Sequence, residues 1–330
     1  MIITRTPFRV SFFGGGTDFP IWYRQHGGAV LTTTIDKYCY ISCRKLPPFF
    51  EHKHRIIYSQ MESVRDTSEI KHPSVKAVLQ HLNVKEGLEI HHDGDLPARS
   101  GLGSSSAFTN GLLLAVKALQ NEFISKEDLA LKAIHVEQDL IGETVGSQDQ
   151  VATAHGGFNR IDFRQDGSIS VSPMIINQEK RDQLERSCLV FFTGLSRFAT
   201  EIEATKMANM ENKSVELMTM RQMVDEACTI LQSPSRSLDE FGRLLHDNWK
   251  LKRSLSTSVS NSRIDELYNA AMAAGATGGK ILGAGGGGFM LFFVPQERQK
   301  AVSEKLHDVL HVNIKFENTG SKIALYDPQL

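Results

Sequence analysis

The segment from Leu96 to Ala107 reads LPARSGLGSSSA. Its two glycines precede a predicted helix over Ser104–Gln120, and its three consecutive serines begin that helix. Backbone N–H groups at a helix N-terminus bind anions, with help from the helix dipole. Serine hydroxyls can bind phosphate oxygens or a magnesium ion. The segment therefore predicts a phosphate-binding loop, with an ordinary serine N-cap after a flexible loop as the alternative. It is not a Walker loop, because no Gly-Lys-Ser/Thr follows at the required spacing.

A second glycine segment, Gly14–Asp18, reads GGGTD and follows a predicted strand over Arg9–Phe13. Glycines allow the backbone to turn and a ligand to approach closely. Thr17 and Asp18 would then present a hydroxyl and a carboxylate to a hydroxylated ligand. The alternative is a plain glycine turn in which Asp18 caps local backbone groups.

A third glycine segment, Gly283–Gly288, formally matches the pattern GxGxxG. A dinucleotide-binding fingerprint should follow a strand and open a helix, whereas this run precedes a predicted strand over Phe289–Val294. The Rossmann interpretation is therefore disfavoured. A close approach of the backbone to a ligand or to another domain is favoured, with a simple hairpin or bulge as the alternative.

Two carboxylates lie between the segment Leu96–Ala107 and the glycine run Gly283–Gly288. Glu137 falls on a predicted helix that ends near Ile141, and Asp149 follows two glycine breaks. Phosphoryl transfer needs a metal ligand and a group that orients or deprotonates the nucleophile. Either residue, taken alone, is more often a solvated surface carboxylate.

The overall composition narrows the class of protein. A length of 330 residues favours two domains, and a formal net charge of −1 gives no global basic surface for nucleic acid. The four cysteines have no zinc-site spacing and are expected to be reduced, mostly buried thiols. No signal peptide is recognisable, and the longest strongly apolar stretch, Phe289–Val294, is too short to span a membrane. We therefore expect a soluble cytoplasmic protein.

Periodicity predicts strands and helices that are partly segregated along the chain, which favours an α+β fold over a doubly wound sheet. The predicted strands are Arg9–Phe13, Ala29–Arg44, Arg55–Ser59, Leu88–His92, Cys188–Phe192, Phe289–Val294, Asn313–Glu317 and Ile323–Tyr326. The predicted helices are Ser104–Gln120, Ser125–Ile141, Arg197–Leu231, Phe241–Leu255, Ser262–Ala274 and Glu297–Leu310. A polar, charged stretch over residues 177–187 suggests a boundary between domains at 1–185 and 186–330.

Taken in chain order, the segments Pro7–Asp18, Leu96–Ala107 and Gly283–Gly288 resemble the first, second and third motifs of the GHMP kinases, the superfamily of galactokinase, homoserine kinase and mevalonate kinase. The interval between Glu137 and Asp149 also resembles galactokinase. The resemblance implies an ATP-dependent kinase with an N-terminal domain like domain 2 of ribosomal protein S5 and a C-terminal ferredoxin-like α/β sandwich. It also implies an active site in the cleft between a domain at 1–185 that binds ATP and a domain at 186–330.

The resemblance assigns roles to individual residues. Asp149 would take the proton from the acceptor hydroxyl, with Arg9 beside it to help neutralise the developing charge. Ser104 and Glu137 would hold Mg²⁺. The residues implied to bind ATP are Pro97, Gly101, Leu102, Gly103, Ser104, Ser105 and Ser106. The residues implied to bind the substrate are Gly15, Gly16, Thr17, Asp18, Asp149, Arg197, Gly286 and Gly287.

Differences between this chain and galactokinase narrow the implied substrate. Galactokinase has Gly-Glu-His-Thr-Asp where this chain has GGGTD, which argues against galactose. The GGGTD form, the following Phe19-Pro20 and Trp22-Tyr23, and the segment Phe192–Arg197 resemble the bacterial D-glycero-D-manno-heptose 7-phosphate kinases, with fucokinase-like domains as near relatives. The implied reaction is transfer of phosphate from ATP to O1, giving the heptose 1,7-bisphosphate for nucleotide-activated heptose and surface polysaccharide.

Several alternatives stay open at this point. The enzyme could act at O1 of fucose or another free monosaccharide, or the chain could be a non-catalytic regulator that binds ATP and sugar. A distal sugar phosphate needs a cationic partner, for which Arg197 and Lys280 are candidates, although each could equally be a surface or structural cation. Tyr58 and Ser59 are candidates for the adenine pocket. Homodimerisation is left open, and neither nucleic acid nor membrane is expected as a partner.

Overall fold

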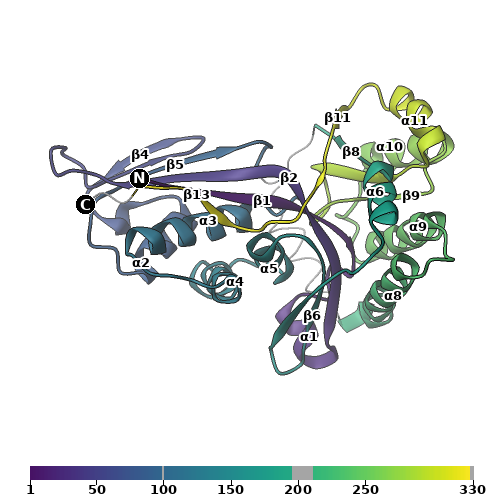
Figure 1. The fold of residues 1–330 in the computed structure, drawn as a ribbon, viewed down its shortest axis with the longest axis horizontal. Helices are drawn as coiled ribbons and strands as arrows, with labels where there is room; N and C mark the ends of the chain where they lie inside the picture. The colour runs from purple at the N-terminus through teal and green to yellow at the C-terminus, as the bar shows by residue number, and fades with distance from the viewer. Residues whose placement is uncertain (99, 195–210, 328–330) are drawn as a thin grey trace.

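A computed structural model of the chain describes residues 1–98, 100–194 and 211–327. The described residues form two β-sheets with helices packed against them (Figure 1), which confirms the α+β prediction. The strands of the first sheet are β1 Ile2–Phe13, β2 Gly28–Lys45, β3 His54–Ile57, β4 Met61–Val64, β5 Leu88–Gly94, β6 Phe158–Phe163, β7 Ile169–Pro173, β12 Phe316–Glu317 and β13 Lys322–Tyr326. Those of the second sheet are β8 Cys188–Phe192, β9 Gly278–Ile281, β10 Phe289–Phe293 and β11 Leu310–Val312.

The helices divide between the two sheets. Those of the first half are α1 Pro20–His26, α2 Pro73–His81, α3 Ser104–Leu119, α4 Lys126–Ile134, a π-helix over His135–Leu140, α5 Gln148–His155 and α6 Gln178–Ser187. Those of the second half are α8 Ser214–Gln232, α9 Leu238–Ser254, α10 Ser262–Ala273 and α11 Gln299–Lys305. Helices α2 to α5 lie along the first sheet, whereas α9 to α11 surround the second (Figure 1).

The first sheet has the order β13-β1-β2-β5-β3-β4, and β2 also pairs with β6 and β12. Its strand pairs are antiparallel except for β3 with β5. The two closing strands predicted near residues 313 and 323 are therefore present, but β13 pairs with β1 and β12 pairs with β2. A division at residue 185 assigns these strands to the second unit, although their hydrogen bonds are made to the first sheet. The domain ranges themselves stay a prediction.

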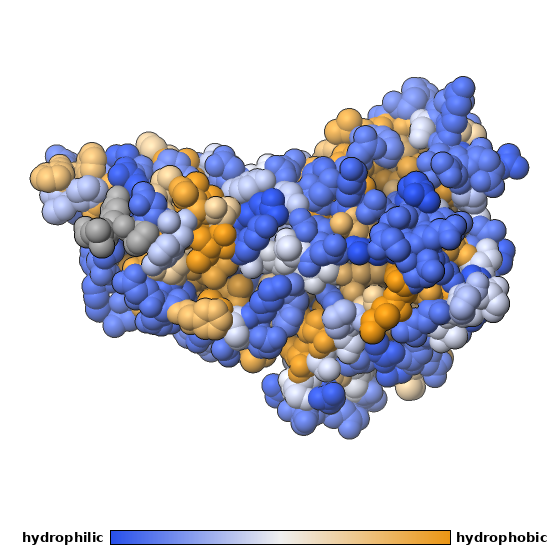
Figure 2. Space-filling view, viewed as in Figure 1, coloured by the Kyte–Doolittle hydropathy of each residue, from blue (hydrophilic) through white to orange (hydrophobic). Residues whose placement is uncertain are grey.

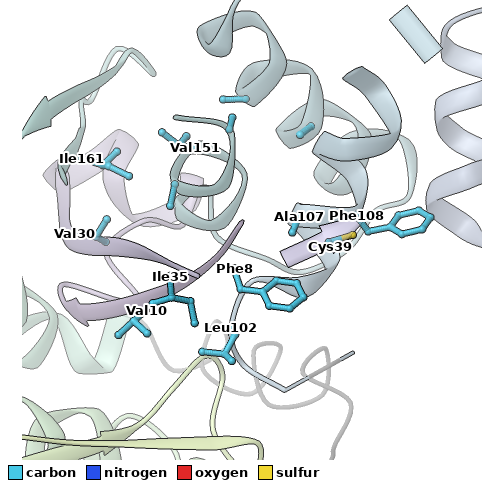
Figure 3. Close-up of a cluster of buried hydrophobic side chains, with 14 of the residues drawn as sticks. Phe8, Val10, Val30, Ile35, Cys39, Leu102, Ala107, Phe108, Val151 and Ile161 are labelled. Atoms are coloured by element: carbon cyan, nitrogen blue, oxygen red, sulfur yellow. The ribbon is translucent and has the colours of Figure 1, made fainter. Parts of the chain in front are cut away.

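Successive side chains of strand β1 point alternately into the apolar core and to the opposite face of the sheet. Phe8, Val10 and Phe12 are buried in the main apolar cluster. Arg9 and Ser11, on the opposite face, line a cavity. The same cluster holds Leu102 of the predicted phosphate loop near Phe8 and Val10 (Figure 3), so the loop is anchored to the core beneath it.

Several predicted elements are longer or shorter than the sequence indicated. The predicted strand Ala29–Arg44 is β2, and the predicted helix Ser104–Gln120 is α3. The polar stretch over 177–187, where the domain boundary is predicted, forms α6, which buries only Leu184 and Ser187. Most of the predicted helix Arg197–Leu231 before Ser214 lies outside the described residues.

The cysteines are in the state expected from the sequence. All four cysteines are buried and outside any disulfide. The face seen in Figure 2 is mostly hydrophilic, with apolar side chains in limited patches. Within the described ranges, no helix is both long and apolar enough to cross a bilayer.

Candidate active site

A cavity lies where elements of the two sheets meet. On one side it is lined by β1, the glycine loop after β1, the loop before α3, the π-helix and the start of α5. On the other side it is lined by α9, β9 and the glycine run after β9. Residues from all three glycine segments and both singled-out carboxylates therefore surround one space, although they are far apart in the sequence.

An arginine–carboxylate pair lies in this cavity. Arg9 Nε donates to Asp149 Oδ1 and Arg9 Nη2 donates to Asp149 Oδ2, both at 2.7 Å. The side chain of Arg9 is 3% exposed, whereas that of Asp149 is 26% exposed. Two parallel charge-assisted hydrogen bonds fix the plane of the carboxylate. Each of its oxygens has a second lone pair, so Asp149 can still accept a proton or hydrogen bond from a molecule in the cavity.

The loop before α3 approaches this pair closely because it contains glycine. Arg9 Nη1 donates to the carbonyl oxygen of Gly101 at 2.7 Å. Gly103 has a φ of +74° and is the N-cap of α3, and a Cβ at this position would lie 3.0 Å from Arg9 Cγ. A glycine cap has no side chain to accept from the first-turn amides, which are therefore left to bind an anion. The serine N-cap alternative is wrong, since Ser104 is the first helical residue.

Glu137 lies on the π-helix and is only 1% exposed. Its Oε2 accepts hydrogen bonds from Ser106 Oγ at 2.9 Å and from Gln150 Nε2 at 2.5 Å. Burial away from water raises the pKa of Glu137 to about 7, against the smaller lowering effect of its hydrogen bonds. Its Oε1 is buried and makes no well-formed hydrogen bond to a described residue, although the Thr109 hydroxyl lies close enough to lower the pKa of this carboxyl. The π-helical turn thus directs a carboxylate into the interior beside the phosphate loop.

These residues fit a magnesium ion. Mg²⁺ prefers oxygen ligands and commonly binds through one or two protein groups together with substrate phosphates. Glu137 supplies a buried carboxylate oxygen that makes no well-formed hydrogen bond in the described structure, and Ser104 lines the same cavity. A divalent cation here would also compensate the cost of burying the ionised carboxylate.

The glycine loop after β1 is fixed by hydrogen bonds of the buried Thr17 side chain. Thr17 is fully buried, and its hydroxyl donates to the carbonyl oxygens of Gly14 and Ala29 at 2.8 and 3.0 Å. Asp18 accepts from the backbone N–H of Gly16 at 2.9 Å, and it lines the cavity. A Cβ on Gly146 would lie only 1.9 Å from Asp18 Oδ2, so the chain leading into α5 must be glycine here. Thr17 thus supports the loop, while Asp18 reaches the cavity.

The third glycine run reaches the phosphate loop. A Cβ on Gly283 would lie 2.5 Å from Gly101 Cα, and one on Gly288 would lie 2.2 Å from the Ser100 carbonyl oxygen. The run also joins β9 to β10, which pair antiparallel. The predicted close approach is therefore confirmed, and the hairpin alternative describes the same segment. The two sheets meet through these backbone contacts.

Most of the predicted site residues share this cavity, but some do not. Those that line it are Arg9, Gly15, Gly16, Asp18, Gly101, Gly103, Ser104, Ser105, Ser106, Glu137, Asp149, Lys280 and Gly287. Outside the lining among described residues are Pro97, which is exposed, and Leu102, Thr17 and Gly286. Tyr58 is also outside it, with its hydroxyl donating to Glu62 at 2.9 Å. Arg197 lies outside the described residues.

Sequence reasoning assigned no role to several polar lining residues, among them Ser11, Gln148, Gln150 and Lys252. Ser11 donates to Gln148 Oε1 at 2.7 Å, and Gln150 binds Glu137. Lys252, on α9, also lines the cavity. A usable signal existed for Lys252 alone, because it continues the helical spacing of the buried residues Phe241 and Leu245.

Comparisons with known proteins agree with this arrangement. The models for the N terminal domain and the C terminal region of the GHMP kinases match residues 70–157 and 226–312. A D-glycero-alpha-D-manno-heptose 7-phosphate kinase from Campylobacter jejuni is 30% identical over 306 residues, covering 89% of each chain. The bifunctional fucokinase/GDP-fucose pyrophosphorylase of Arabidopsis thaliana is 25% identical over 94% of this chain, which spans 32% of that protein.

Solved structures show the same fold. The crystal structure of a D-glycero-D-manno-heptose 1-phosphate kinase from Bacteriodes thetaiotaomicron matches with a TM-score of 0.81 and 23% identity, covering 99% of this chain and all of that one. A mevalonate kinase structure matches with a TM-score of 0.73 over 96% of this chain. The predicted two-domain fold is thereby confirmed, and the chain belongs to the GHMP kinases.

Proposed function

We propose that this ATP-dependent kinase transfers the γ-phosphoryl group of ATP to the anomeric O1 of D-glycero-D-manno-heptose 7-phosphate. The products would be ADP and the 1,7-bisphosphate, a step toward nucleotide-activated heptose and surface polysaccharide. The Campylobacter relative supports the substrate, since it is 30% identical over 89% of both chains. The observation that carries the chemistry is the bidentate Arg9–Asp149 pair beside an uncapped helix N-terminus.

Asp149 acts as the general base in this proposal. As the O1–phosphorus bond forms and the bond from phosphorus to the ADP oxygen breaks, the hydroxyl proton passes to the Asp149 carboxylate. Arg9 keeps this carboxylate oriented through two hydrogen bonds at 2.7 Å and contributes positive charge beside the transferring group. Phosphoryl transfer relies mainly on such positioning and charge stabilisation.

The ATP phosphates bind the first turn of α3. Gly103 carries no side chain to occupy the amides of this turn, and Ser104 and Ser105 line the cavity beside them. Glu137 and Ser104 hold Mg²⁺, which when bound supplies charge neutralisation to the β- and γ-phosphates. Gln150 orients Glu137 by donating to its Oε2.

Asp149→Asn tests the catalytic assignment. Asparagine keeps the shape of the side chain but cannot take the proton, so kcat should fall by about 10²- to 10⁴-fold while ATP still binds. Asp139→Asn is the matched control, because Asp139 is 67% exposed on the π-helix. Turnover by Asp149→Asn close to that of the wild type would rule out the general-base role.

A panel of sugars tests the substrate. ADP release should be fastest with D-glycero-D-manno-heptose 7-phosphate and much slower with free heptose, fucose or galactose. The Arabidopsis fucokinase relative favours a second candidate, a kinase acting at O1 of a free monosaccharide. A clear preference for free fucose would replace the heptose proposal with that one. ATP binding without turnover on any sugar would instead support a non-catalytic regulator.

A further inference from the structure

Lys252 is a charged residue on the buried face of α9. The helix spans Leu238–Ser254 and buries Phe241, Leu245 and Trp249. Lys252 continues this face and is only 6% exposed, yet it lines the active-site cavity. Removing an ammonium group from water is costly, so a lysine at such a position needs compensating partners. A cavity that receives anionic substrates is one source of compensation.

Hydrogen bonds to the backbone hold the Lys252 ammonium against the glycine run. Its Nζ donates to the carbonyl oxygen of Ile281 at 2.8 Å and to that of Gly283 at 2.6 Å. These two contacts restrict the side chain to one position. The group is thus placed in advance, which lowers the entropy cost of binding an anion.

A chain of contacts relates Lys252 to the catalytic pair along one side of the cavity. Asp149 binds Arg9, and Arg9 Nη1 donates to the Gly101 carbonyl oxygen. Gly101 packs directly against Gly283, whose carbonyl oxygen binds Lys252. All five residues line the cavity, so this chain follows its wall from the phosphate-loop side to α9.

A second chain of contacts closes the ring along the sugar loop. One helical turn after Lys252, the Leu255 side chain lies 3.9 Å from the position of a Cβ on Gly16. The adjacent Gly15 faces the side-chain amide of Gln148, with 3.7 Å from its Cβ position to Nε2. Gln148 directly precedes the catalytic aspartate on α5. Two series of contacts along the cavity wall therefore separate Lys252 from the carboxylate that would receive the O1 proton.

Lys280, the other buried lysine of the lining, lies nearer the catalytic side. Its Nζ donates to the carbonyl oxygens of Ser11 and Phe12 on β1, both at 2.9 Å. Ser11 in turn binds Gln148, the neighbour of Asp149. Because an acceptor sugar bound with O1 at Asp149 extends away from that residue, Lys252 is better placed than Lys280 for its far end.

We propose that Lys252 binds the phosphate group at the distal end of the acceptor sugar and so selects phosphorylated over free sugars. This inference rests on the proposed function, because it requires an acceptor that carries a phosphate away from the reacting hydroxyl. Lysine is a compact, strongly charged phosphate partner. The loop before α3 binds the ATP phosphates, so Lys252 contributes to acceptor recognition and leaves nucleotide affinity largely unchanged.

Steady-state kinetics of Lys252→Gln test this role. KM for heptose 7-phosphate should rise by about 100-fold, the usual effect of losing one partner of a desolvated charge pair. KM for ATP and kcat/KM for free heptose should each stay within about threefold. Lys252→Arg keeps the charge and should retain the preference for the phosphorylated sugar. The control is Lys250→Gln, because Lys250 is 61% exposed on the same helix.

The outcomes separate this inference from the proposed function. If the wild type prefers heptose 7-phosphate and Lys252→Gln keeps that preference, the Lys252 assignment is wrong and the proposed function stands. If the wild type prefers a different phosphorylated sugar and Lys252→Gln loses the preference, the subsite stands and the heptose assignment falls. A rise mainly in KM for ATP would overturn the subsite. Should Lys252→Gln fail to fold, loss of the preference in a folded Lys252→Arg variant would also count against it.

Discussion

Replacing Glu137 with glutamine is expected to change how the stability of the ligand-free protein depends on pH. The carboxyl group is fully buried, and burial raises its pKa from an ordinary value near 4.5 to about 7. Glutamine has nearly the same shape and can still accept from Ser106, but it does not ionise. The difference in unfolding free energy between the two proteins therefore isolates the titration of this one group.

The sign and size follow from proton linkage. Between pH 4.5 and 7 the folded protein keeps the proton on Glu137, whereas the unfolded chain has lost it. The stability that this protonated group contributes is therefore complete below pH 4.5 and is lost as the pH rises through 7. A shift from 4.5 to about 7 corresponds to about 3 kcal/mol. Relative to wild type, Glu137→Gln should gain about 3 kcal/mol of stability between pH 4.5 and pH 8.

Urea unfolding in the presence of EDTA, repeated across this pH range, measures the difference directly. Glu86→Gln is the control, since the Glu86 side chain is 55% exposed. Adding millimolar Mg²⁺ with an ATP analogue at pH 8 should then stabilise the wild type more than Glu137→Gln, because a ligand stabilises the state that binds it. A wild-type to variant difference that stays constant from pH 4.5 to 8 would refute the reasoning.

Two glycine substitutions test the geometry of the site. Gly103→Ala should lower kcat on the order of 10²-fold, because the added methyl group displaces Arg9. The control is Gly142→Ala, which should leave kcat unchanged. Gly142 has a similar φ of +76°, but no described heavy atom lies within 4 Å of its Cβ position. Equal losses of kcat in the two variants would attribute the effect to backbone strain alone. Gly146→Ala should raise KM for the sugar roughly tenfold, because the added methyl group displaces Asp18, and KM for ATP should stay unchanged. An unchanged KM for the sugar would exclude Asp18 from acceptor binding.

The sequence predicted the glycine-rich parts of the site because their chemistry is local. A glycine before three serines and a helical pattern is enough to predict an anion site at Ser104, and α3 begins there. The alternative of a serine N-cap is wrong, because the cap is Gly103, whose Cβ position would lie 3.0 Å from Arg9 Cγ. Pattern alone reveals neither that contact nor the return of the final strand, β13, to β1, because both depend on residues distant in the sequence.

The π-helix at Glu137 could not be predicted from periodicity. Residues 125–141 read as one continuous helix, and the structure departs from α-helical geometry only from His135 onward. The wider turn accompanies the burial of Glu137 against Ser106 and Gln150, which belong to two other helices. A conformation stabilised by such contacts has no signature in its own segment, and only the residue type at 137 suggested a role.

The buried lysines show where sequence reasoning could have gone further. Lys280 lies in a four-residue strand that is buried throughout, so no two-residue alternation of apolar and polar positions distinguishes its side chain. Lys252, by contrast, falls on the apolar face of a seventeen-residue helix, where a lysine is out of place. Both lysines come from the second unit, whereas Glu137 and Asp149 come from the first. The cavity between them is therefore lined by carboxylates from the first unit and by lysines from the second.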